Sequence, residues 1–589
     1  MKKNIKDKLF VLPIVLIIAI VPLIVRYKRI ELGEVVASYW IGDYNIDFFS
    51  YYKMIFLLGF TFLALISFYI YSKKEPQAIR ANNSIKKLYY YPIAVYIVMV
   101  IISTIFSEAQ LTSLTGFPDR YEGMPVLLSY MLIVIITINL FRTKEQFKFI
   151  INALLTSAFV IAIIGLSQFF EADLMQTSFG KWLMLPHSGF TEISQNLDSR
   201  FDGNNILFAT LYNPNYAGSY FSMLFILSSV LYFFEEKIKR KVILGGVTVL
   251  MFAAWLGSLS RAGILGSLFA LVILSVILRK EIIKRWKSIF IITLVFLLVF
   301  SFMDFYTEGS LRREFLSLGE ETQLALSGET AEIEEVKNED GFLIFNTAEE
   351  KLKFKFDGNG KLYIADKNNN SLDYILDNNN YKFTKPKLDN YSFNIYDNIL
   401  KLNYGNKTIS FIYSSLFNQF LVIGIKNNHY FLKEVKSWGF EGKEMLASKR
   451  GYIWSRTTPL LGNTLFTGYG PDTFALFFPQ HDVIGKIKYF NSPAILVDKA
   501  HNFYLQIWTN TGFISLLALI ILFLIYLSRN IFYFFNINFS NFYSQIGIAF
   551  LGATLAYFTA ALFNDSVISV APVFWTILGL GVAIELKRY

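Results

Sequence analysis

The chain contains twelve stretches of mainly apolar residues, each long enough to cross the hydrocarbon core of a bilayer as a helix of about 20 residues. Apolar residues make up 54% of the sequence and charged residues only 17%, which leaves too little polar surface for a soluble protein of 589 residues. The sequence therefore predicts a mainly α, polytopic membrane protein with about 12 transmembrane helices. The stretches lie near residues 9–25, 54–72, 88–106, 125–141, 150–170, 215–234, 242–257, 262–278, 288–303, 512–528, 545–563 and 569–586.

The distribution of lysine and arginine predicts the orientation of these spans. If the N-terminus is cytoplasmic, the inside segments hold 24 basic residues and the short outside loops hold seven. Such an excess marks the cytoplasmic side, so both termini are predicted to be cytoplasmic in the cell membrane. No small-residue cleavage site follows the first stretch, and we interpret it as a retained span. The glycine-containing stretches 242–257 and 262–278 form either two spans or a re-entrant pair. The seven outside residues are Arg26, Lys28, Arg29, Arg120, Lys181, Arg200 and Arg261.

A gap of about 200 residues separates the ninth stretch from the tenth, and the parity of the spans places it outside the cell. Residues 351–356 alternate strictly between lysine and an apolar residue, a turn follows at 357–360, and apolar residues resume at 361–364. This pattern predicts a β-hairpin. Similar alternation recurs at 394–396 and 401–413, separated by asparagine-rich turns.

We therefore predict a β-rich extracytoplasmic insert at about 330–436 that acts as a binding or spacer module. Its flanks, 305–328 and 440–511, are predicted to be more helical and to lie along the membrane surface. The resulting domain prediction is a membrane domain with spans 1–9 at 1–303, a large extracytoplasmic loop at 304–511, and a membrane domain with spans 10–12 at 512–589.

The composition also excludes several kinds of chemistry. The absence of cysteine rules out disulfides, a thiol nucleophile and cysteine-ligated metals, and four histidines leave little for a zinc site. No Asp-x-Asp sequence occurs, and we interpret the nearest alternative, Glu171-Ala172-Asp173, as a surface acidic pair. We predict no metal and no cofactor. The net charge of +10 is explained by membrane orientation, so no nucleic-acid partner is predicted.

Polar motifs gather at the predicted outside ends of the spans, where ionisable residues are costly unless they have a partner or a ligand. They are Gly116-Phe117-Pro118-Asp119-Arg120-Tyr121-Glu122-Gly123, Tyr212-Asn213-Pro214-Asn215-Tyr216-Ala217-Gly218, Ser258-Leu259-Ser260-Arg261-Ala262-Gly263, Arg450-Gly451-Tyr452-Ile453-Trp454-Ser455-Arg456, Gly468-Tyr469-Gly470-Pro471-Asp472 and Lys499-Ala500-His501-Asn502.

In these motifs and their order the chain resembles the O-antigen ligase and polymerase superfamily, over about 100–300 and 445–586. The ligases end with a His, then Asn, Ser or Gln, nine residues, Gly, two residues, and Gly, Thr or Tyr. Here His501-Asn502 is followed by nine residues, Gly512, two residues and Ser515, so only the last position departs from the pattern. Members are integral-membrane glycosyltransferases that use polyprenyl-diphosphate-linked glycans.

The resemblance implies an enzyme that moves a preassembled glycan from a polyprenyl-diphosphate carrier, such as undecaprenyl diphosphate, to an acceptor hydroxyl at the outer face of the cytoplasmic membrane. It implies catalytic roles for Arg261, Arg450 and His501. Arginine suits the binding of a diphosphate because its guanidinium is permanently charged and binds phosphate oxygens bidentately. A histidine is suited to take the proton of the acceptor hydroxyl, and a single displacement inverts the anomeric configuration. The predicted substrate-binding residues are Arg456, Arg120, Asn213, Asn215 and Asn502.

Each assignment has a structural alternative. Arg261 is also explained as a snorkelling interfacial residue, and Arg450 and Arg456 as parts of a solvated basic run. Arg120 pairs with Glu122 in the simplest interpretation. Asn213 and Asn215 flank Pro214 in a sequence typical of a helix start. The other three histidines, His187, His429 and His481, are interpreted as ordinary surface residues.

The motifs favour a ligase for cell-envelope polysaccharide biosynthesis, whose acceptor is a glycan, lipid, protein or wall polymer. A polymerase of lipid-linked repeats differs only in its acceptor and remains the alternative. A polysaccharide or lipid transporter would show related halves with polar residues at the bilayer midplane, and we find neither. A receptor with an external β sensor would need a cytoplasmic output element, for which the inside loops are too short.

Overall fold

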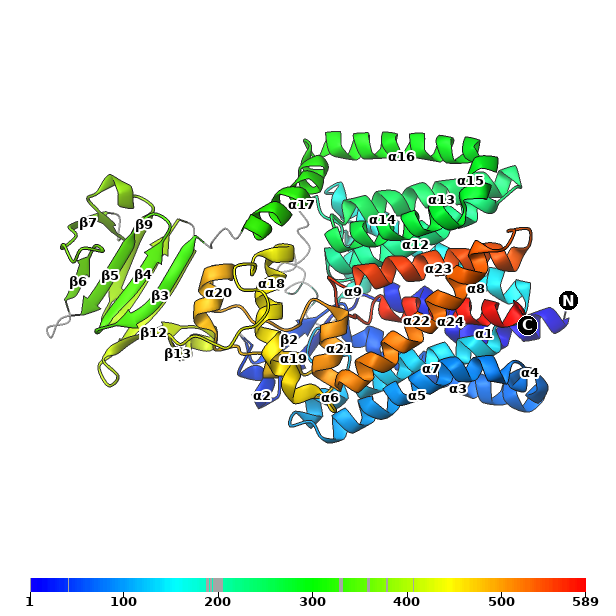
Figure 1. Ribbon diagram of the computed structural model, residues 1–589, viewed down its shortest axis with the longest axis horizontal. Helices are drawn as coiled ribbons and strands as arrows, with labels where there is room; N and C mark the ends of the chain where they lie inside the picture. Colours follow the sequence, from blue (N-terminus) through cyan, green and yellow to red (C-terminus); the bar gives the residue numbers. More distant parts are fainter. Residues whose placement is uncertain are drawn as a thin grey trace.

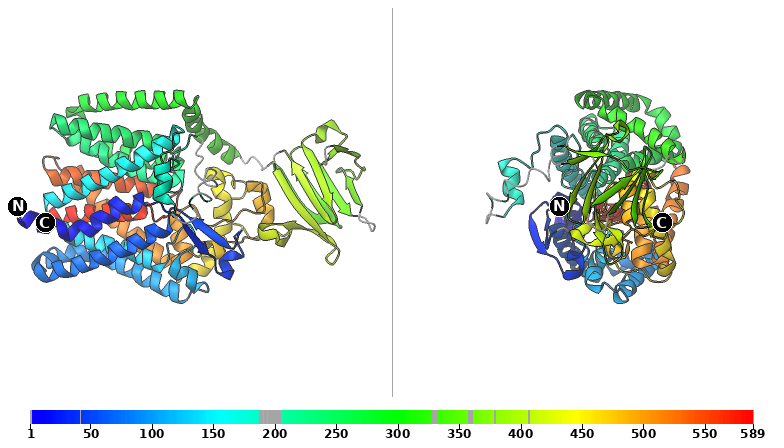
Figure 2. Two further views of the ribbon diagram at one scale, coloured as in Figure 1. Left: turned by 180° about the vertical axis from the view of Figure 1, so that it is seen from behind. Right: turned by 90° about the vertical axis from the view of Figure 1, so that its left-hand side faces the viewer.

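The computed structural model describes residues 2–40, 42–186, 190, 193, 205–327, 332–356, 361–377, 380–405 and 407–588. An elongated helical body carries a β domain at one end, and both chain termini lie at the other (Figures 1 and 2). We call the end with the β domain the distal end and the end with the termini the terminal end. His187, Arg200, the predicted turn at 357–360 and part of the asparagine-rich turn at 378–380 lie outside the described residues.

Each of the twelve apolar stretches coincides with a helix of the body. By length and composition, seven of the described helices can cross a membrane, namely α3, α5, α8, α12, α13, α16 and α22, whereas α7 and α14 are shorter apolar helices. The total of about 12 spans stays a prediction. The twelve helices are α1 (Lys2–Ile20), α3 (Tyr51–Lys74), α5 (Asn83–Ile105), α7 (Met124–Leu140), α8 (Lys144–Phe169), α12 (Pro214–Phe234), α13 (Ile238–Gly257), α14 (Arg261–Ile277), α16 (Trp286–Tyr306), α22 (Phe513–Phe535), α23 (Phe542–Ala560) and α24 (Ala571–Glu585).

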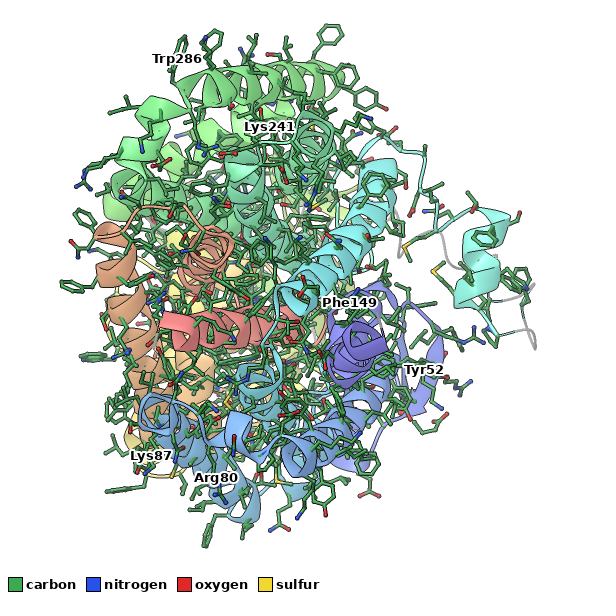
Figure 3. All side chains as sticks on the ribbon, turned by 90° about the vertical axis from the view of Figure 1, so that its right-hand side faces the viewer. Tyr52, Arg80, Lys87, Phe149, Lys241 and Trp286 are labelled. Carbon is green, nitrogen blue, oxygen red and sulfur yellow. The ribbon has the colours of Figure 1, made fainter. Side chains whose placement is uncertain are left out.

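Helices α13 and α14 each run along the helical body, so the structure favours two helices over a re-entrant pair (Figure 1). Figure 3 looks onto the terminal end, where Arg80, Lys87 and Lys241 lie. Both termini therefore lie at a basic end and the β domain at the other. The side of the membrane on which each end lies stays a prediction.

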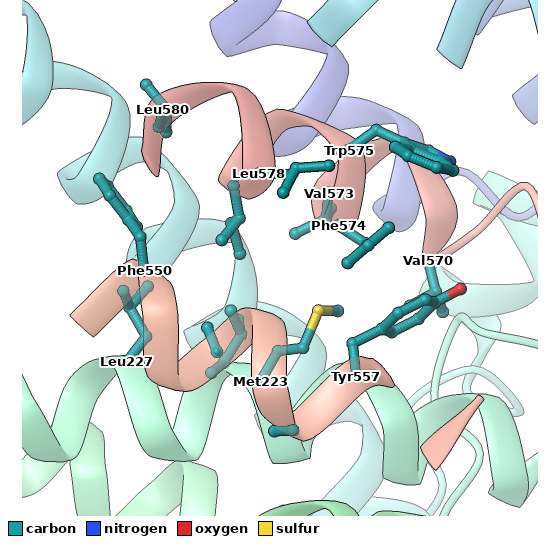
Figure 4. Packing of buried hydrophobic residues seen from close by; sticks show 14 of the residues in the cluster. Met223, Leu227, Phe550, Tyr557, Val570, Val573, Phe574, Trp575, Leu578 and Leu580 are labelled. Carbon is teal, nitrogen blue, oxygen red and sulfur yellow. The ribbon is translucent and has the colours of Figure 1, made fainter. Parts of the chain in front are cut away.

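Helix α12 forms the centre of the body: 89% of the residues in an apolar 18-residue stretch of this helix are buried. In lipid the hydrophobic effect does not drive helices together, so close packing around small residues has to do so. A Cβ at Gly552 of α23 would lie 2.7 Å from Leu274 Cδ1 of α14 and 2.8 Å from Ile226 Cγ2 of α12. Helix α23 also packs against α24 (Figure 4). The rings of Tyr557 of α23 and Phe574 of α24 are stacked there, with centroids 4.2 Å apart.

Shorter elements connect the spans and build the distal end. At the distal end a two-stranded antiparallel hairpin, β1 (Lys28–Glu31) and β2 (Tyr44–Asp47), follows α1. The other α-helices in the described part of the chain are α2 (Glu34–Ala37), α4 (Pro76–Arg80), α6 (Gln110–Thr115), α9 (Ser178–Met184), α15 (Arg279–Lys284), α17 (Ser310–Ser327), α18 (Leu446–Thr457), α19 (Phe474–Phe477), α20 (Val483–Phe490) and α21 (Phe503–Thr511).

The β domain consists of two antiparallel sheets that share one apolar core. The predicted hairpin forms as β5 and β6, and the predicted alternation at 394–413 forms β9, β10 and β11. One sheet has the order β3 (Ile333–Glu339), β4 (Phe342–Thr347), β5 (Lys351–Phe356) and β6 (Leu362–Ala365). The other has the order β13 (His429–Phe431), β12 (Gln419–Ile423), β11 (Lys407–Ser414), β10 (Ile399–Tyr404), β9 (Tyr391–Tyr396), β8 (Asn380–Phe383) and β7 (Tyr374–Asp377).

Helix α20 fastens the β domain to the helical body. Val483 and Ile487 are fully buried in the apolar core of the β domain. Tyr489 and Phe490, further along the same helix, pack against Tyr452 of α18. The position of the β domain is thus tied to α18, the helix that contains Arg450.

Candidate active site

Arg261 is the first residue of α14, in a tight turn at the distal end. The Ser260 hydroxyl caps the helix by accepting a hydrogen bond from the Gly263 amide at 3.3 Å. The Arg261 guanidinium reaches over the turn, donating to Glu314 Oε1 at 2.7 Å and to the hydroxyls of Ser448 at 3.0 Å and Ser317 at 3.1 Å. Its side chain is 21% exposed and that of Glu314 is 30% exposed, so this ion pair is open to a competing anion.

Arg450 begins the regular part of α18. The three preceding residues have positive φ angles, 53° at Ala447, 57° at Ser448 and 71° at Lys449. Backbone conformations of this kind are costly for residues with a Cβ and concentrate at functional sites. The left-handed run brings the Ser448 hydroxyl to the Arg261 guanidinium, and Arg450 is close enough for the charge of Arg261 to act on it.

The Arg450 side chain is half-buried and has few protein partners. Nη1 donates to the Ala447 carbonyl at 3.0 Å, whereas the buried Nε has no hydrogen-bond partner among the described residues. Within the described part of the chain Arg450 forms no ion pair. Burial lowers its pKa, the carboxylate of Asp565 opposes this effect, and the charge of Arg261 adds to it. An arginine remains charged in spite of such a shift. The side chain therefore carries a positive charge that the protein neutralises only in part.

His501 lies in the loop before α21, with a left-handed φ of 50°. Its Nδ1 faces Oδ1 of Asp565 at 3.5 Å. The surroundings lower the pKa of His501 to about 4, mainly because burial disfavours the imidazolium and although Asp565 favours it. The side chain nevertheless keeps 31% exposure, so the imidazole is both neutral at physiological pH and accessible.

Asp565 lies between α23 and α24, and its side chain is fully buried. Oδ2 accepts hydrogen bonds from Tyr216 at 2.9 Å and from Arg120 at 3.2 Å. Oδ1 faces the imidazole of His501 and has no hydrogen-bond partner among the described residues. Burial opposes its ionisation, but Lys499, His501 and Arg120 together hold the pKa of Asp565 below its usual value. The carboxylate is therefore ionised, and it lies on the Nδ1 side of the imidazole.

Lys499 completes this group. Its ammonium donates to the Tyr216 hydroxyl at 2.9 Å and lies 3.4 Å from Asp498. Burial acts against the ammonium, yet Asp498, Tyr216 and Asp565 raise the pKa of Lys499 well above its usual value. We call Tyr216, Arg450, Lys499, His501 and Asp565 the histidine cluster.

Arg120 also binds Asp565 of the histidine cluster but, unlike Arg450, it is surrounded by carboxylates. Its guanidinium donates to Asp472 Oδ1 at 2.7 Å and to Asp565 Oδ2 at 3.2 Å, and lies 3.7 Å from Glu122 Oε2. Asp472 also accepts from the backbone amides of Phe117 and Glu122. Pairing with Glu122 is thus present but is the longest of the three contacts. The side chain is buried, with 4% exposure, so these carboxylates compensate its charge within the protein.

Arg456 is not brought to the histidine cluster. It donates to Asp482 at 2.9 Å, lies 3.7 Å from Glu444, and stacks over the Tyr452 ring at 4.7 Å. Asp482 caps α20 by accepting from the Gly485 amide. Arg456 therefore joins α18 to α20, and its predicted role in substrate binding has no support from this geometry.

The three predicted asparagines lie at helix starts. Asn213 caps α12 through the Asn215 amide at 2.8 Å, and Asn502 caps α21 through the Leu505 amide at 3.0 Å. Asn215 accepts a long hydrogen bond from Ser260 at 3.4 Å and thereby connects α12 to the Arg261 turn. Gly512, at the junction of α21 and α22, has a φ of 93°, and a Cβ there would lie 2.6 Å from the Phe466 carbonyl. The spacing from Asn502 to Gly512 thus corresponds to one short helix and its end.

Sequence reasoning missed Asp565, Asp472, Lys499 and Tyr216 as site residues. Lys499 and Asp472 stand in the predicted motifs but were given no role there, and Asp565 is a lone carboxylate between two apolar stretches. A carboxylate in that position needs a partner, which is a signal for a site. No group of three or more metal-ligating side chains was found among the described residues. Asp173 accepts a hydrogen bond from the Met175 amide in the turn after α8.

The fold and the site define a polytopic membrane protein with a histidine and several cations gathered at the distal end. A family model described as O-antigen ligase matches residues 398–520, a range that includes β10 to β13, Arg450 and His501. The match confirms the resemblance to the O-antigen ligase superfamily and supports a membrane glycosyltransferase of the ligase or polymerase kind. No curated protein and no solved structure matches the chain.

Proposed function

We propose that the protein transfers a preassembled glycan from a polyprenyl-diphosphate carrier to an acceptor hydroxyl at the outer face of the cytoplasmic membrane, as a metal-independent, inverting ligase. One observation carries this proposal. A neutral, accessible histidine faces a buried carboxylate at 3.5 Å, beside an arginine that forms no ion pair within the described residues. Such a site combines a proton acceptor with a partly uncompensated positive charge. A direct displacement on a glycosyl diphosphate needs both.

His501 serves as the base in this proposal. With Nδ1–H directed at Asp565, the lone pair on Nε2 is free to accept the proton of the acceptor hydroxyl. The acceptor oxygen then attacks the anomeric carbon while the bond from that carbon to the diphosphate oxygen breaks. The proton ends on Nε2, and the electron pair of the broken bond leaves with the polyprenyl diphosphate. Attack opposite to the leaving group inverts the anomeric centre.

Arg450 and Arg261 stabilise the leaving diphosphate in this proposal. Negative charge grows on the bridging oxygen in the transition state, and preorganised cations in a site with little water stabilise it strongly. The buried Nε of Arg450 gains its missing acceptor from a phosphate oxygen. The half-exposed guanidinium of Arg261 exchanges Glu314 for the second phosphate.

Transfer by the purified protein with a polyprenyl-diphosphate-linked glycan tests the proposal. We expect transfer with and without a chelator, and loss of transfer in Arg261→Ala and His501→Ala with normal membrane insertion. His481→Ala is the matched control, since His481 is exposed in the described structure. Full activity in both site variants would refute the site. Identification of the glycosylated product distinguishes a ligase from a polymerase.

The orientation is tested separately. The chain has no cysteine, so single cysteines report accessibility without background. A cysteine at position 370 in the β domain should react with an impermeant reagent in intact cells. Reaction only after permeabilisation would place the β domain inside the cell and overturn the orientation.

A further inference from the structure

A crevice of about 400 Å³ opens at the terminal end of the helical body, far from the histidine cluster. Its walls come from the start of α8, the turn between α12 and α13, and the start of α23. Four basic side chains line it, namely Lys144, Lys148, Lys237 and Arg240. Nothing in the proposed transfer reaction uses this crevice.

The crevice changes character with depth. Along α8 the lining passes from Lys144 and Lys148 to Ile151 and Leu155, and along α13 from Arg240 to Leu244. From Lys144 to Leu155, α8 rises about 16 Å, which is about half the hydrocarbon thickness of a bilayer. A site for a small soluble anion needs no apolar depth. This gradient instead matches a molecule with an anionic head and apolar chains.

The cations at the mouth are only partly neutralised. Lys144 and Lys148 lie over the Phe542 ring, at 4.9 Å and 5.8 Å from its centroid. Among the described residues, no ion pair joins Lys144, Lys148 or Lys237 to a carboxylate. Two carboxylates also line the crevice, but Glu235 pairs with Arg240 at 3.5 Å and Glu236 pairs with Arg285 at 3.2 Å. Three lysines thus remain for an anionic ligand.

We propose that this crevice is a binding site for one anionic phospholipid, with its phosphate among Lys144, Lys148 and Lys237 and an acyl chain along Ile151 and Leu155. Basic pockets between transmembrane helices recognise such headgroups, and each lysine near a membrane surface strengthens the attraction to anionic lipid. The interaction is independent of the glycan transfer proposed above.

Native mass spectrometry of the full-length protein in detergent tests the site, with dioleoylphosphatidylglycerol and dioleoylphosphatidylcholine as probes. We expect retention of the anionic lipid at least 10-fold tighter than that of the zwitterionic lipid. The triple variant Lys144→Gln, Lys148→Gln, Lys237→Gln should lower the affinity for the anionic lipid by up to about 100-fold. Substitution of the same three lysines by arginine keeps the charge and should retain binding. This second variant shows that any loss is due to charge and not to misfolding.

The matched control is Lys73→Gln, Lys74→Gln, Lys280→Gln. Lys73 and Lys74 also lie over aromatic rings, of Tyr69 and Phe10, and none of the three lines this crevice. Equal loss in the control variant would overturn the site in favour of general surface attraction. Equal binding of the two lipids, or displacement of the lipid by an equal concentration of inorganic phosphate, would also overturn it.

Discussion

Arg120 is buried and Arg450 half-buried at the distal end, and Asp565 acts on the charge of both, but the two arginines have different partners. Arg120 meets three carboxylates, of Glu122, Asp472 and Asp565. Arg450 forms no ion pair among the described residues and keeps a buried Nε without a partner. The first charge is satisfied within the protein, whereas the second remains available. The contrast separates an arginine that stabilises the site from one that is suited to a ligand.

Burial alone therefore does not identify a functional arginine. A buried charge without compensation lowers stability, so its presence needs a benefit that the unliganded structure does not contain. Arg261 is intermediate, since its ion pair with Glu314 is half-exposed and exchangeable.

Arg120→Met should destabilise the protein by about 3–5 kcal/mol, because it leaves Asp472, Asp565 and Glu122 buried without their cation. Thermal unfolding in detergent, followed by the loss of helical circular dichroism, measures the change. Arg450→Met, which leaves no carboxylate unpaired among the described residues, is the control and should unfold near the wild-type temperature. Equal unfolding temperatures for the two variants would remove the distinction between the two arginines.

Arg450→Ala should lower the rate of glycan transfer by about 100-fold to 1,000-fold, the usual cost of removing one preorganised donor at a developing negative charge. Single-turnover transfer from a lipid-linked donor measures it. Arg450→Lys keeps the charge without the bidentate geometry and should recover part of the rate. Arg313→Ala, in which an exposed arginine of α17 is removed, is the matched control. A normal rate in Arg450→Ala would assign Arg450 to the structure alone.

The pH dependence of transfer should show that His501 is neutral. Its pKa of about 4 lies below the ordinary 6.5, so the base form persists as the pH falls from 7 to about 5. His501 also makes stability depend on pH. Between pH 6.5 and 4 this histidine binds a proton more readily in the unfolded chain than in the folded protein, so the folded protein loses stability as the pH falls through that window. The charged groups that face the imidazole are Lys499, Arg450, Asp498 and Asp565.

A profile of kcat/KM against pH checks this expectation, since it reports the free enzyme. Burial raises the pKa of Glu122 to about 7, so the profile is also recorded for Glu122→Gln. An acid limb near pH 6.5 that persists in Glu122→Gln would mean that His501 has an ordinary pKa. Asp565→Asn removes the carboxylate that favours the imidazolium and should move the remaining acid limb to lower pH.

Most of the fold could be predicted because its signals are local. Apolar stretches of about 20 residues coincide with the helices of the body, and strict alternation at 351–356 predicts β5. The hairpin of β1 and β2 was not predicted, since strands of four residues are too short to show a period. The packing role of α20 was also hidden, because its partners in the β domain are distant in sequence.

The site could be predicted only in part, because some of its residues are brought together by the fold from distant positions in the sequence. Arg261, Arg450 and His501 stand in recognisable motifs, but Asp565 has no fixed spacing from His501 and is connected to it only by the fold. A basic run likewise does not show which of its members are paired. Arg450 and Arg456 are alike in the sequence, yet Asp482 binds only the second.

Glu314→Gln should give the smallest effect, an increase of up to about 5-fold in affinity for the donor. Glu314 is bound to Arg261 at 2.7 Å in the described structure, so an incoming diphosphate has to displace it. A half-exposed ion pair of this kind contributes at most about 1 kcal/mol, which limits the gain. The KM for the donor measures this gain in affinity. Glu308→Gln, in the turn before α17, is the control, since Glu308 is exposed. A higher KM would show that Glu314 positions Arg261 for the donor. The Arg261–Glu314 ion pair would then be structural, like the ion pairs of Arg120.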